Sequence, residues 1–576
     1  MSFDRATLFP EGELPAHKML LDEGSALARN WQVQPGAFLR ATGFACEADY
    51  KRAKASEAKV MSHAHMGFRD TRKSLDALGH IYTECEKRGA RIDRFGITLD
   101  WSMGMRRDER AGQMQGTGLV LKSPEAFAAL GEAAPAAPHF GDFVLGFPAS
   151  VENVQGALSA GSTAIGNLGQ YFTFRLPGHT DDIEATAETV KALGLIAAQK
   201  CQVLVHSNLD DGFAAVFRDL GSVLGAALVE KYIVEDLIGA SLVHCYGHHF
   251  TEPVRRLAFH LALKNVSTNP GTMVYGNTVS YRGTHAENYA ALANYLSVDI
   301  AAQLLAPSGH AINPVPVSEN ERIPDAGEII DAQCFAARMM EQAVQSTPLI
   351  DTQPAQQIAN RIVQGAMRFK ENLLKGFKNA GIDITSSFEM LLAIRRIGGR
   401  TLETLYGTNP PTVTSPLVEE LEEHRVHHLG EVTVQNQTAL KAQGLSVLSA
   451  TTDVHEHGKM VLDNVLTDLG VRVFDGGVSC DVDVLADQAK TLQPDAIALS
   501  TYNGVALTYA RSLKRVLERA KLNVPILIGG RLNQIPEGSN TSLPVDVSEK
   551  LRQEGFVVCE QIEDAVPALL KIKEKT

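Results

Sequence analysis

The stretch that decides the fold of the carboxyl-terminal part of the chain is Thr452-Asp453-Val454-His455-Glu456-His457-Gly458. The residues before it, 444–450 (GLSVLSA), form a short apolar run that predicts a strand, and residues 459–466 (KMVLDNVL) have the apolar spacing of a helix. The stretch therefore predicts a strand-to-helix turn that carries an Asp, a His and a Gly. A histidine in a loop is more often solvated than functional, so the spacing to later motifs decides its interpretation.

Two further strand ends follow at defined intervals. Between Gly458 and Ser500 lie 41 residues, and between Ser500 and Gly529 lie 28 residues. Ser500 and the pair Gly529-Gly530 each end a short apolar run that predicts a buried strand. All three signals fall at the carboxyl ends of strands that alternate with helices. In an open parallel sheet, this edge is where ligands bind.

The order Asp-x-His-x-x-Gly, Ser and Gly-Gly at these spacings resembles the cobalamin-binding domain of adenosylcobalamin mutases and methionine synthase. The resemblance covers roughly residues 440–576 and implies a doubly wound parallel sheet. It implies that His455 replaces the dimethylbenzimidazole tail as the lower axial ligand of cobalt. It also implies that the displaced nucleotide tail enters a slot between the sheet and the helices, past Ser500, Gly529 and Gly530.

The chemistry of these residues agrees with the resemblance. Imidazole is a good ligand for cobalt, and Asp453, on the same side of the strand end as His455, can accept its second ring N–H. Gly458 lets the turn approach a bulky ring without an intervening side chain. Tyr502 stands where the family usually has Leu, and a tyrosine can still line the tail slot. The predicted cofactor-binding residues are Asp453, His455, Gly458, Ser500, Tyr502, Gly529 and Gly530, with His455 as the metal ligand.

The bulk properties of the chain narrow its class. Its 576 residues exceed one ordinary domain. A formal net charge of −13 argues against binding to nucleic acid or to an anionic membrane surface. Seven scattered cysteines without a C-x-x-C motif indicate a reducing compartment and exclude the common zinc frameworks. Because we find no signal peptide and no membrane-length apolar run, we expect a cytoplasmic protein, and we expect a homodimer.

The amino-terminal part has the alternation of an α/β protein. From about residue 58 to 320, short apolar runs alternate with helical segments, and about eight such units predict a (β/α)₈ barrel, with an open doubly wound sheet as the alternative. The predicted strands are residues 59–63, 95–100, 142–146, 163–167, 202–206, 241–244 and 297–300.

The chain is predicted to have three parts. Residues 1–345 form the barrel with its amino-terminal arm, residues 346–440 a helical segment and linker, and residues 441–576 the cobalamin-binding domain. The helical predictions around the second part cover residues 325–345, 354–380, 386–397 and 417–428, with prolines between the last two.

Polar residues follow most of the predicted strands of the barrel, where they would line a catalytic mouth. They are His63, His65, Arg69, Asp100, Trp101, Asn167, Gln170, Tyr171, Arg175, His206, Asn208, Asp210, His244, Tyr246, His248, His249, Asn269, Tyr275, Asn277, Tyr281 and Arg282. Arg and His are the usual partners of a partly buried carboxylate. We therefore predict that Arg69, Arg175, His206, His244 and Arg282 contact a small carboxylate substrate.

Two patterns in this part resemble a metal site and a dinucleotide-binding loop but lack the required spacing. The motif His63-x-His65 and the pair His248-His249 lack the H-E-x-x-H type of spacing, so we expect no zinc or iron there. The glycines of residues 161–169 (GSTAIGNLG) do not follow the G-x-G-x-x-G register of a dinucleotide-binding loop.

A barrel followed by a cobalamin-like domain resembles the carbon-skeleton mutases, such as glutamate mutase and 2-methyleneglutarate mutase. The resemblance implies adenosylcobalamin as the cofactor, with the barrel mouth over the upper face of the corrin, and a radical rearrangement of a small carboxylic acid. The cofactor carries the hard chemistry, so few catalytic groups are needed.

Three alternatives remain open. A cobalamin-dependent methyltransferase would use residues 355–405 as a helical cap. A non-enzymatic cobalamin sensor needs no substrate pocket. A pyridoxal-phosphate-dependent aminomutase needs a Schiff-base lysine, and the sequence does not single one out. No motif identifies the substrate.

Overall fold

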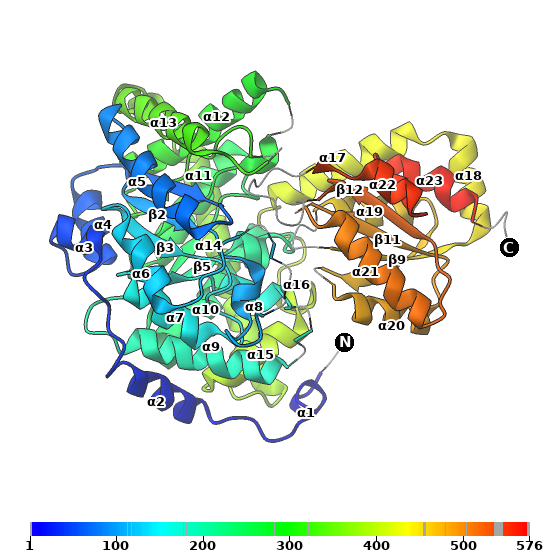
Figure 1. The fold of residues 1–576 in the computed structure, drawn as a ribbon, viewed down its shortest axis with the longest axis horizontal. Coiled ribbons are helices and arrows are strands. Elements are labelled where there is room, and N and C mark those ends of the chain that lie inside the picture. The colour runs from blue at the N-terminus through cyan, green and yellow to red at the C-terminus, as the bar shows by residue number, and fades with distance from the viewer. Residues whose placement is uncertain are drawn as a thin grey trace. The chain divides into compact units, whose positions relative to one another are not determined.

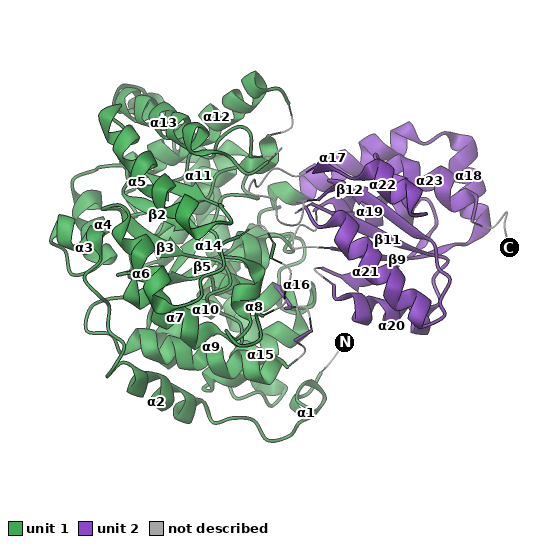
Figure 2. Ribbon diagram, viewed as in Figure 1, with its two compact units in different colours: residues 1–173, 181–417 green, residues 174–180, 418–576 purple. Residues whose placement is uncertain are grey.

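The computed structural model forms two compact units, which are described separately (Figures 1 and 2). Unit 1 comprises Met1–Thr173 and Asp181–Leu417, and unit 2 comprises Phe174–Thr180 and Val418–Thr576. The three-part division expected from the sequence stays a prediction. The structure describes residues 3–111, 113, 115–116, 118–176, 178–179, 181–281, 283–319, 322–452, 457–478, 480–502, 504–534 and 545–572.

Unit 1 contains eight short strands whose pairings are all parallel. They form the sheets β1-β2-β3, β4-β5-β6 and β7-β8. The strands are β1 His63–Met66, β2 Arg94–Ile97, β3 Ala137–Phe140, β4 Ala164–Gly166, β5 Leu204–Asn208, β6 Ser241–Cys245, β7 Met273–Val274 and β8 Ala311–Ile312.

Isolated parallel bridges connect these three sheets. Tyr246 pairs with Val274, which places β6 beside β7, and Ser62 pairs with Ile312, which places β8 beside β1. Strand β3 also lies against β4, where His139 Nδ1 is 2.9 Å from the Ala164 carbonyl oxygen. The strands of unit 1 therefore neighbour one another in chain order.

Helices separate consecutive strands of unit 1, and a helical group follows the last strand. The α-helices are α1 Arg5–Leu8, α2 His17–Leu27, α3 Ala37–Thr42, α4 Glu47–Ser56, α5 Thr71–Lys87, α6 Pro124–Glu132, α7 Ser150–Ser159, α8 Gly169–Thr173, α9 Asp182–Ala197, α10 Leu220–Lys231, α11 Pro253–Val266, α12 His285–Leu305, α13 Ala326–Ser346, α14 Gln353–Asn379, α15 Ser387–Ile397 and α16 Gly399–Tyr406. Irregular helical turns cover Trp101–Gly104, Asp210–Ala214, Tyr232–Ile238, Thr278–Ser280 and Thr347–Leu349.

Two of the predicted strands are wrong. Residues 142–146 form turns that follow β3, because the strand lies earlier, at residues 137–140. Residues 297–300 lie inside the 21-residue helix α12, which a capping box between Thr284 and Glu287 starts. The predicted helices fared better, and α15 begins within one residue of its expected start.

The helical group α14 to α16 belongs to unit 1. Helix α14 packs against α10 and α11, and its buried stripe includes Ile362, Phe369 and Phe377. Helix α16 packs against α14 and α15. These helices therefore complete the core of unit 1.

The amino-terminal arm is also part of unit 1. Helix α2 packs against α9, and Arg5 Nη2 lies 2.6 Å from Glu389 Oε1 of α15. Helix α4 brings Glu47 to a buried position, where its Oε1 is 2.9 Å from Arg94 Nε and 3.4 Å from Lys51 Nζ. Because these charges are buried, each depends on its partner.

Unit 2 contains a five-stranded parallel sheet in the order β10-β9-β11-β12-β15, with helices on both faces (Figure 1). Its elements are α17 Pro416–Glu431, α18 Val434–Gln443, β9 Ser446–Thr451, α19 His457–Asp468, β10 Arg472–Gly477, α20 Val482–Leu492, β11 Ala496–Thr501, α21 Ala506–Arg519, β12 Ile526–Gly530, α22 Ser548–Gln553, β15 Val557–Cys559 and α23 Ala565–Leu570, with a small hairpin of β13 Asn533–Gln534 and β14 Val545–Asp546 and a short turn at Ile562–Asp564. This order is that of a doubly wound sheet.

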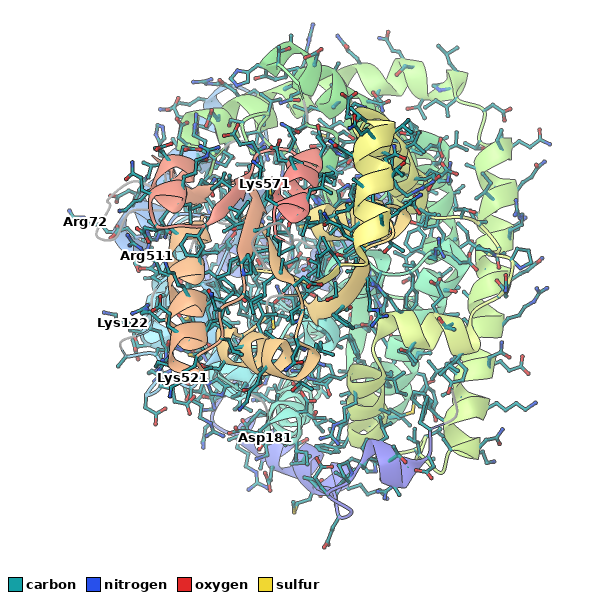
Figure 3. All side chains as sticks on the ribbon, turned by 90° about the vertical axis from the view of Figure 1, so that its right-hand side faces the viewer. Arg72, Lys122, Asp181, Arg511, Lys521 and Lys571 are labelled. Atoms are coloured by element: carbon teal, nitrogen blue, oxygen red, sulfur yellow. The ribbon has the colours of Figure 1, made fainter. Side chains whose placement is uncertain are left out.

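Charged side chains lie on the surface of both units. Figure 3 labels Arg72 and Lys122 of unit 1 and Arg511 and Lys521 of unit 2, all exposed. Among the described helices, none has the length and apolar character needed to cross a membrane.

Candidate functional site

The sheet order of unit 2 defines a switch point between β9 and β11. The connection from β9 leads outward to β10, and the chain then returns to β11 on the other side of β9. At such a point the loops after the two strands diverge and leave a crevice. The predicted metal ligand, His455, and its predicted partner, Asp453, follow β9 and lie outside the described residues.

One face of this sheet carries small residues at its carboxyl edge. Thr451, Ser500 and Gly529 pair across β9, β11 and β12, so they form a row. The opposite face holds the apolar core with α20, α21 and α22. Helix α19 lies against β9, β10 and β11. The row of small residues therefore lies on the face that α19 covers.

Gly458 lies directly over this row. A Cβ added there would be 3.0 Å from Ser500 Oγ and would meet no other described atom within 4 Å. Ser449, two residues before Thr451 on the same face, is completely buried, and its Oγ has no hydrogen-bond partner among the described residues. Small residues with an unpartnered hydroxyl suit a slot for a polar ligand tail.

Gly529 and Gly530 have a second reason to be glycine. A Cβ on Gly530 would lie 2.4 Å from the Thr501 carbonyl oxygen, and its φ of +94° is in the left-handed region. A Cβ on Gly529 would lie 2.9 Å from the Cys559 carbonyl oxygen. The sheet itself thus requires both glycines, and their predicted role in a slot stays a prediction.

Two charged residues border this edge of unit 2. Tyr502 is 39% exposed, and the Arg531 guanidinium lies 5.8 Å from its ring centroid. Lys459 in the first turn of α19 is buried, and its Nζ lies 2.7 Å from Asp463 Oδ2 and 2.9 Å from Asp475 Oδ1. Burial opposes its charge, but the two carboxylates raise its pKa above the ordinary value. Lys459 is therefore held as a cation.

In unit 1, the ends of β5 and β6 carry a network with its hydrogen bonds satisfied. Asp210 accepts the backbone N–H of His248 at 3.0 Å, the backbone N–H of His249 at 2.9 Å, and the His249 ring Nδ1–H at 3.1 Å. Although burial opposes its charge, these contacts lower the pKa of Asp210. The carboxylate fixes the loop after β6.

The structure places the two predicted histidines on opposite faces of neighbouring strands. His206 of β5 pairs in register with Val243, so its neighbour Ser207 pairs with His244. His244 Nε2 lies 2.6 Å from Glu230 Oε2 of α10, on the helix side. His206 turns the other way, with Nδ1 2.8 Å from Thr272 Oγ1 and its ring 4.5 Å from that of His139. These two residues are therefore not brought together.

The three predicted arginines differ in how the structure describes them. Arg69 follows β1 and is half-buried; its Nη2 donates to the Gln115 carbonyl at 3.2 Å, and its Nε has no partner among the described residues. Arg175 belongs to the segment 174–180, which is grouped with unit 2. Arg282 lies outside the described residues. The substrate contacts assigned to all five residues stay predictions.

A pair of carboxylates absent from the predicted site lies at the ends of β3 and β5. Asp142 is 3.3 Å from Gln170 Nε2, and Asn167 donates to Asp211. Burial and mutual repulsion raise the pKa of Asp142, and burial together with the neighbouring Asp210 raises the pKa of Asp211. Asp142 was missed because it fell inside a predicted strand; a polar residue directly after residues 137–140 was the available signal.

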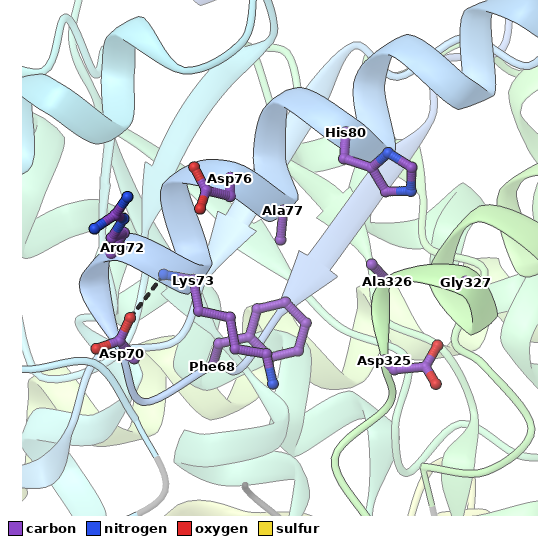
Figure 4. Close-up of a pocket in the computed structure, with 10 residues that line it drawn as sticks. All are labelled: Phe68, Asp70, Arg72, Lys73, Asp76, Ala77, His80, Asp325, Ala326 and Gly327. Atoms are coloured by element: carbon purple, nitrogen blue, oxygen red, sulfur yellow. Dashed lines mark hydrogen bonds between the residues drawn. The ribbon is translucent and has the colours of Figure 1, made fainter. Parts of the chain in front are cut away.

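A surface hollow of about 670 Å³ lies beside the first turns of α5 and α13 (Figure 4). Phe68 forms part of its wall, with Lys73 Nζ 4.6 Å from the ring centroid. Asp70 caps α5 by accepting from the Lys73 backbone N–H at 2.7 Å, and Asp325 caps α13. Asp70 and Asp325 are thus engaged in helix capping. No group of three or more possible metal ligands is found among the described residues of the chain.

Comparison with known proteins agrees with the geometry of unit 2. Residues 445–569 match the family described as the B12 binding domain. A 1.5 Å crystal structure of a novel cobalamin-binding protein from Desulfitobacterium hafniense DCB-2 is similar, with 19% sequence identity, over 27% of this chain and 82% of that one, at a TM-score of 0.20. Residues 445–569, in the carboxyl-terminal part of this chain, thus form a B12-binding domain.

Proposed function

We propose that this chain is an adenosylcobalamin-dependent mutase that rearranges the carbon skeleton of a small carboxylic acid. The observation that carries the proposal is the combination, in one chain, of a B12-binding domain with a set of eight parallel strands whose carboxyl ends hold buried polar groups. A protein that only sensed cobalamin would not need the second feature.

The residues of unit 2 suit the cofactor. Gly458, Ser500 and Ser449 provide small side chains and an unpartnered hydroxyl along the face where a nucleotide tail would lie. His455 would ligate cobalt from below, and Asp453 would fix its tautomer. Adenosylcobalamin, when bound, supplies a carbon-centred radical that removes a hydrogen atom from the substrate.

We also propose that the eight strands close into a (β/α)₈ barrel. Contacts across the interior support closure. Arg94 of β2 reaches β7, with its Nη1 3.8 Å from Met273 Sδ. Ala137 of β3 shares one apolar cluster with Cys245 of β6 and Ala311 of β8. In a closed barrel, the carboxyl ends of the strands form one mouth.

The chain's own residues would bind the substrate, orient it and exclude water. Arg69 is a candidate to hold a carboxylate, because its Nε is buried and unpartnered among the described residues. Asp142 and Asp211, with raised pKa values, can hold or release a proton near neutral pH. A closed interior keeps a reactive radical from solvent.

The packing of α14 to α16 disfavours the methyltransferase alternative. A helical cap over cobalamin would have to pack on the B12-binding domain. These helices instead bury their apolar stripe against α10 and α11 within unit 1.

The test is anaerobic incubation of the full chain with adenosylcobalamin and a panel of small carboxylic acids. We expect the electron paramagnetic resonance signal of cob(II)alamin with one acid only, together with an isomer of that acid. In His455→Ala the nitrogen superhyperfine coupling should disappear. Methyl transfer from methylcobalamin to an added acceptor, with no signal for any acid, would refute the mutase. Sedimentation of the same sample tests the proposed homodimer.

A further inference from the structure

Buried polar atoms without hydrogen-bond partners gather near β8 and β1. Asn313, which directly follows β8, is 1% exposed, and neither its Oδ1 nor its Nδ2 has a partner among the described residues. On β1, His63 Nε2 and His65 Nδ1 are likewise buried and unpartnered within the described part of the chain. A buried polar atom that stays unpaired destabilises the folded chain, so the group indicates an absent partner.

The strand pairing shows that these atoms share one side. The bridge between Ser62 and Ile312 places β8 beside β1. Ile312 packs outward among residues of α12, whereas Ala311 belongs to the cluster on the opposite face. Because side chains alternate along a strand, Asn313 faces the same side as Ala311.

The strands on either side of β8 meet in this layer. Tyr275 follows β7, and its ring lies 6.1 Å from the ring of His65 on β1. His65 Nε2 is 2.7 Å from Thr98 Oγ1, beyond β2. Asn313 therefore lies between two strands whose side chains already approach each other.

Gly96 allows the two imidazoles to pack closely against the backbone of β2. A Cβ on this β2 residue would lie 2.4 Å from His65 Nδ1 and 2.6 Å from His63 Nε2. Both unpartnered nitrogens thus face the same spot on the inner side of β2. A side chain at position 96 would occupy that spot.

The unpartnered atoms of Asn313, His63 and His65 belong to uncharged groups. The neighbouring Arg94 is paired with Glu47, with Nε 2.9 Å from Oε1, and its Nη2 has no partner among the described residues. Arg94 can only donate, so its Nη1 at 3.3 Å makes His63 Nδ1 the acceptor, and Nε2 carries the hydrogen. Burial, with Arg94 beside them, lowers the pKa of His63 well below its ordinary value and that of His65 to about 4. Asn313 contributes a neutral donor and a neutral acceptor.

We propose that Asn313, His63 and His65 form a subsite for an uncharged group that both donates and accepts hydrogen bonds, a hydroxyl or a carboxamide on the substrate. This inference rests on the proposed function, because it makes the barrel mouth the substrate site. The substrate carboxylate belongs with Arg69.

The first experiment replaces Asn313 with leucine, which has a similar volume and no polar atoms. If the Asn313 amide is unpaired until a ligand binds, the melting temperature of the ligand-free full chain should stay the same or rise in Asn313→Leu. The matched control is Asn153, equally buried, whose Nδ2 donates to the carbonyls of Met103 at 2.7 Å and Phe143 at 3.0 Å. Asn153→Leu should melt lower. A fall as large in Asn313→Leu as in Asn153→Leu would make the amide structural and overturn the inference.

The second experiment measures binding by calorimetry to the full chain without cobalamin. The probes are three pairs of acids that differ by a hydroxyl: malate and succinate, 3-hydroxybutyrate and butyrate, lactate and propionate. We expect the hydroxy acid of at least one pair to bind tenfold more tightly than its partner, and the preference to vanish in Asn313→Leu. No preference in any pair overturns the inference. Because no cobalamin is present, failure of the mutase chemistry leaves this result unchanged.

Discussion

The ends of β5 and β6 differ from the ends of β8 and β1 in how their polar groups are used. At β5 and β6, Asp210 receives three hydrogen bonds from His248 and His249. At β8 and β1, Asn313 and His65 keep polar atoms that no described residue contacts. Asp210 and Asn313 are both buried, and both lie just after the carboxyl end of a strand.

The difference separates residues that hold the fold from residues that hold a ligand. A buried group whose hydrogen bonds are satisfied contributes to the stability of the loop that carries it. A buried group left unpaired is a cost to the folded chain, and it is retained where something else supplies the partner. A polar residue at a strand end is therefore informative only once its contacts are known.

The largest loss of stability should come from a change at Asp210, whose hydrogen bonds are satisfied. Asp210→Ala removes the acceptor of three N–H groups in a buried place, so we expect a loss of about 3 kcal/mol or more in the free energy of unfolding. Urea denaturation of the full chain measures it. Asp142→Asn is the control, because the pKa of Asp142 is raised and its charge is not stabilised. Equal losses of unfolding free energy in both variants would contradict the distinction between residues that hold the fold and residues that hold a ligand.

An added methyl group beside His63 and His65 should destabilise the fold. In Gly96→Ala the new methyl would lie within 2.6 Å of the unpartnered nitrogens of His63 and His65. We expect a loss of about 1–3 kcal/mol in unfolding free energy. Gly67→Ala is the control, since the nearest atoms there are 3.7 Å away, and its effect should stay within about 0.5 kcal/mol. A neutral Gly96→Ala would mean that the histidines have room to move.

The acid pair should give a measurable pH dependence. The folded chain raises the pKa of Asp142 and Asp211, so it holds protons that the unfolded chain has lost above about pH 4. The stability that these groups contribute is present at low pH and falls as the pH rises through their folded pKa values. Replacing both by Asn should flatten this fall in a series of urea titrations. An unchanged profile in the double variant would assign the slope to other groups.

The smallest effect on stability should occur in unit 2, where the same contrast recurs between two glycines. Gly458 faces a flexible hydroxyl, and Gly530 faces backbone. Gly458→Val should change the melting temperature little but weaken cobalamin binding at least tenfold, as measured by absorbance titration with hydroxocobalamin. Gly530→Val should lower the melting temperature, so it cannot report on binding alone. Unchanged affinity in Gly458→Val would show that the tail does not pass this residue.

The sequence predicted unit 2 better than unit 1 for a physical reason. In unit 2, the predicted strand ends at Ser500 and at Gly529-Gly530 coincide with the ends of β11 and β12, at intervals set by the intervening helices. In unit 1, β7 and β8 are two residues long, and no alternation can be detected in two residues. Residues 297–300 have the composition of a strand, yet the capped helix around them decides their structure.

The direction in which a strand side chain points was the second feature that the sequence could not predict. His206 and His244 both end predicted strands, and nothing in the sequence distinguishes them. The register places them on opposite faces, so one meets Glu230 on a helix and the other faces the interior. Asn313 could not be found at all, because an asparagine before a proline is ordinarily a turn residue. Its significance comes only from its burial and its missing partners.

The contact between the two ends of unit 1 has a consequence for synthesis. Arg5 binds Glu389, which is 384 residues further along the chain. At about 5–20 residues per second, the ribosome needs roughly 20–80 s to make the partner after the first helix has emerged. During that time helix α1 lacks its contact with α15. Unit 1 therefore cannot finish folding from its amino terminus onward, and its earliest segment is the one that a ribosome-bound chaperone would meet for longest.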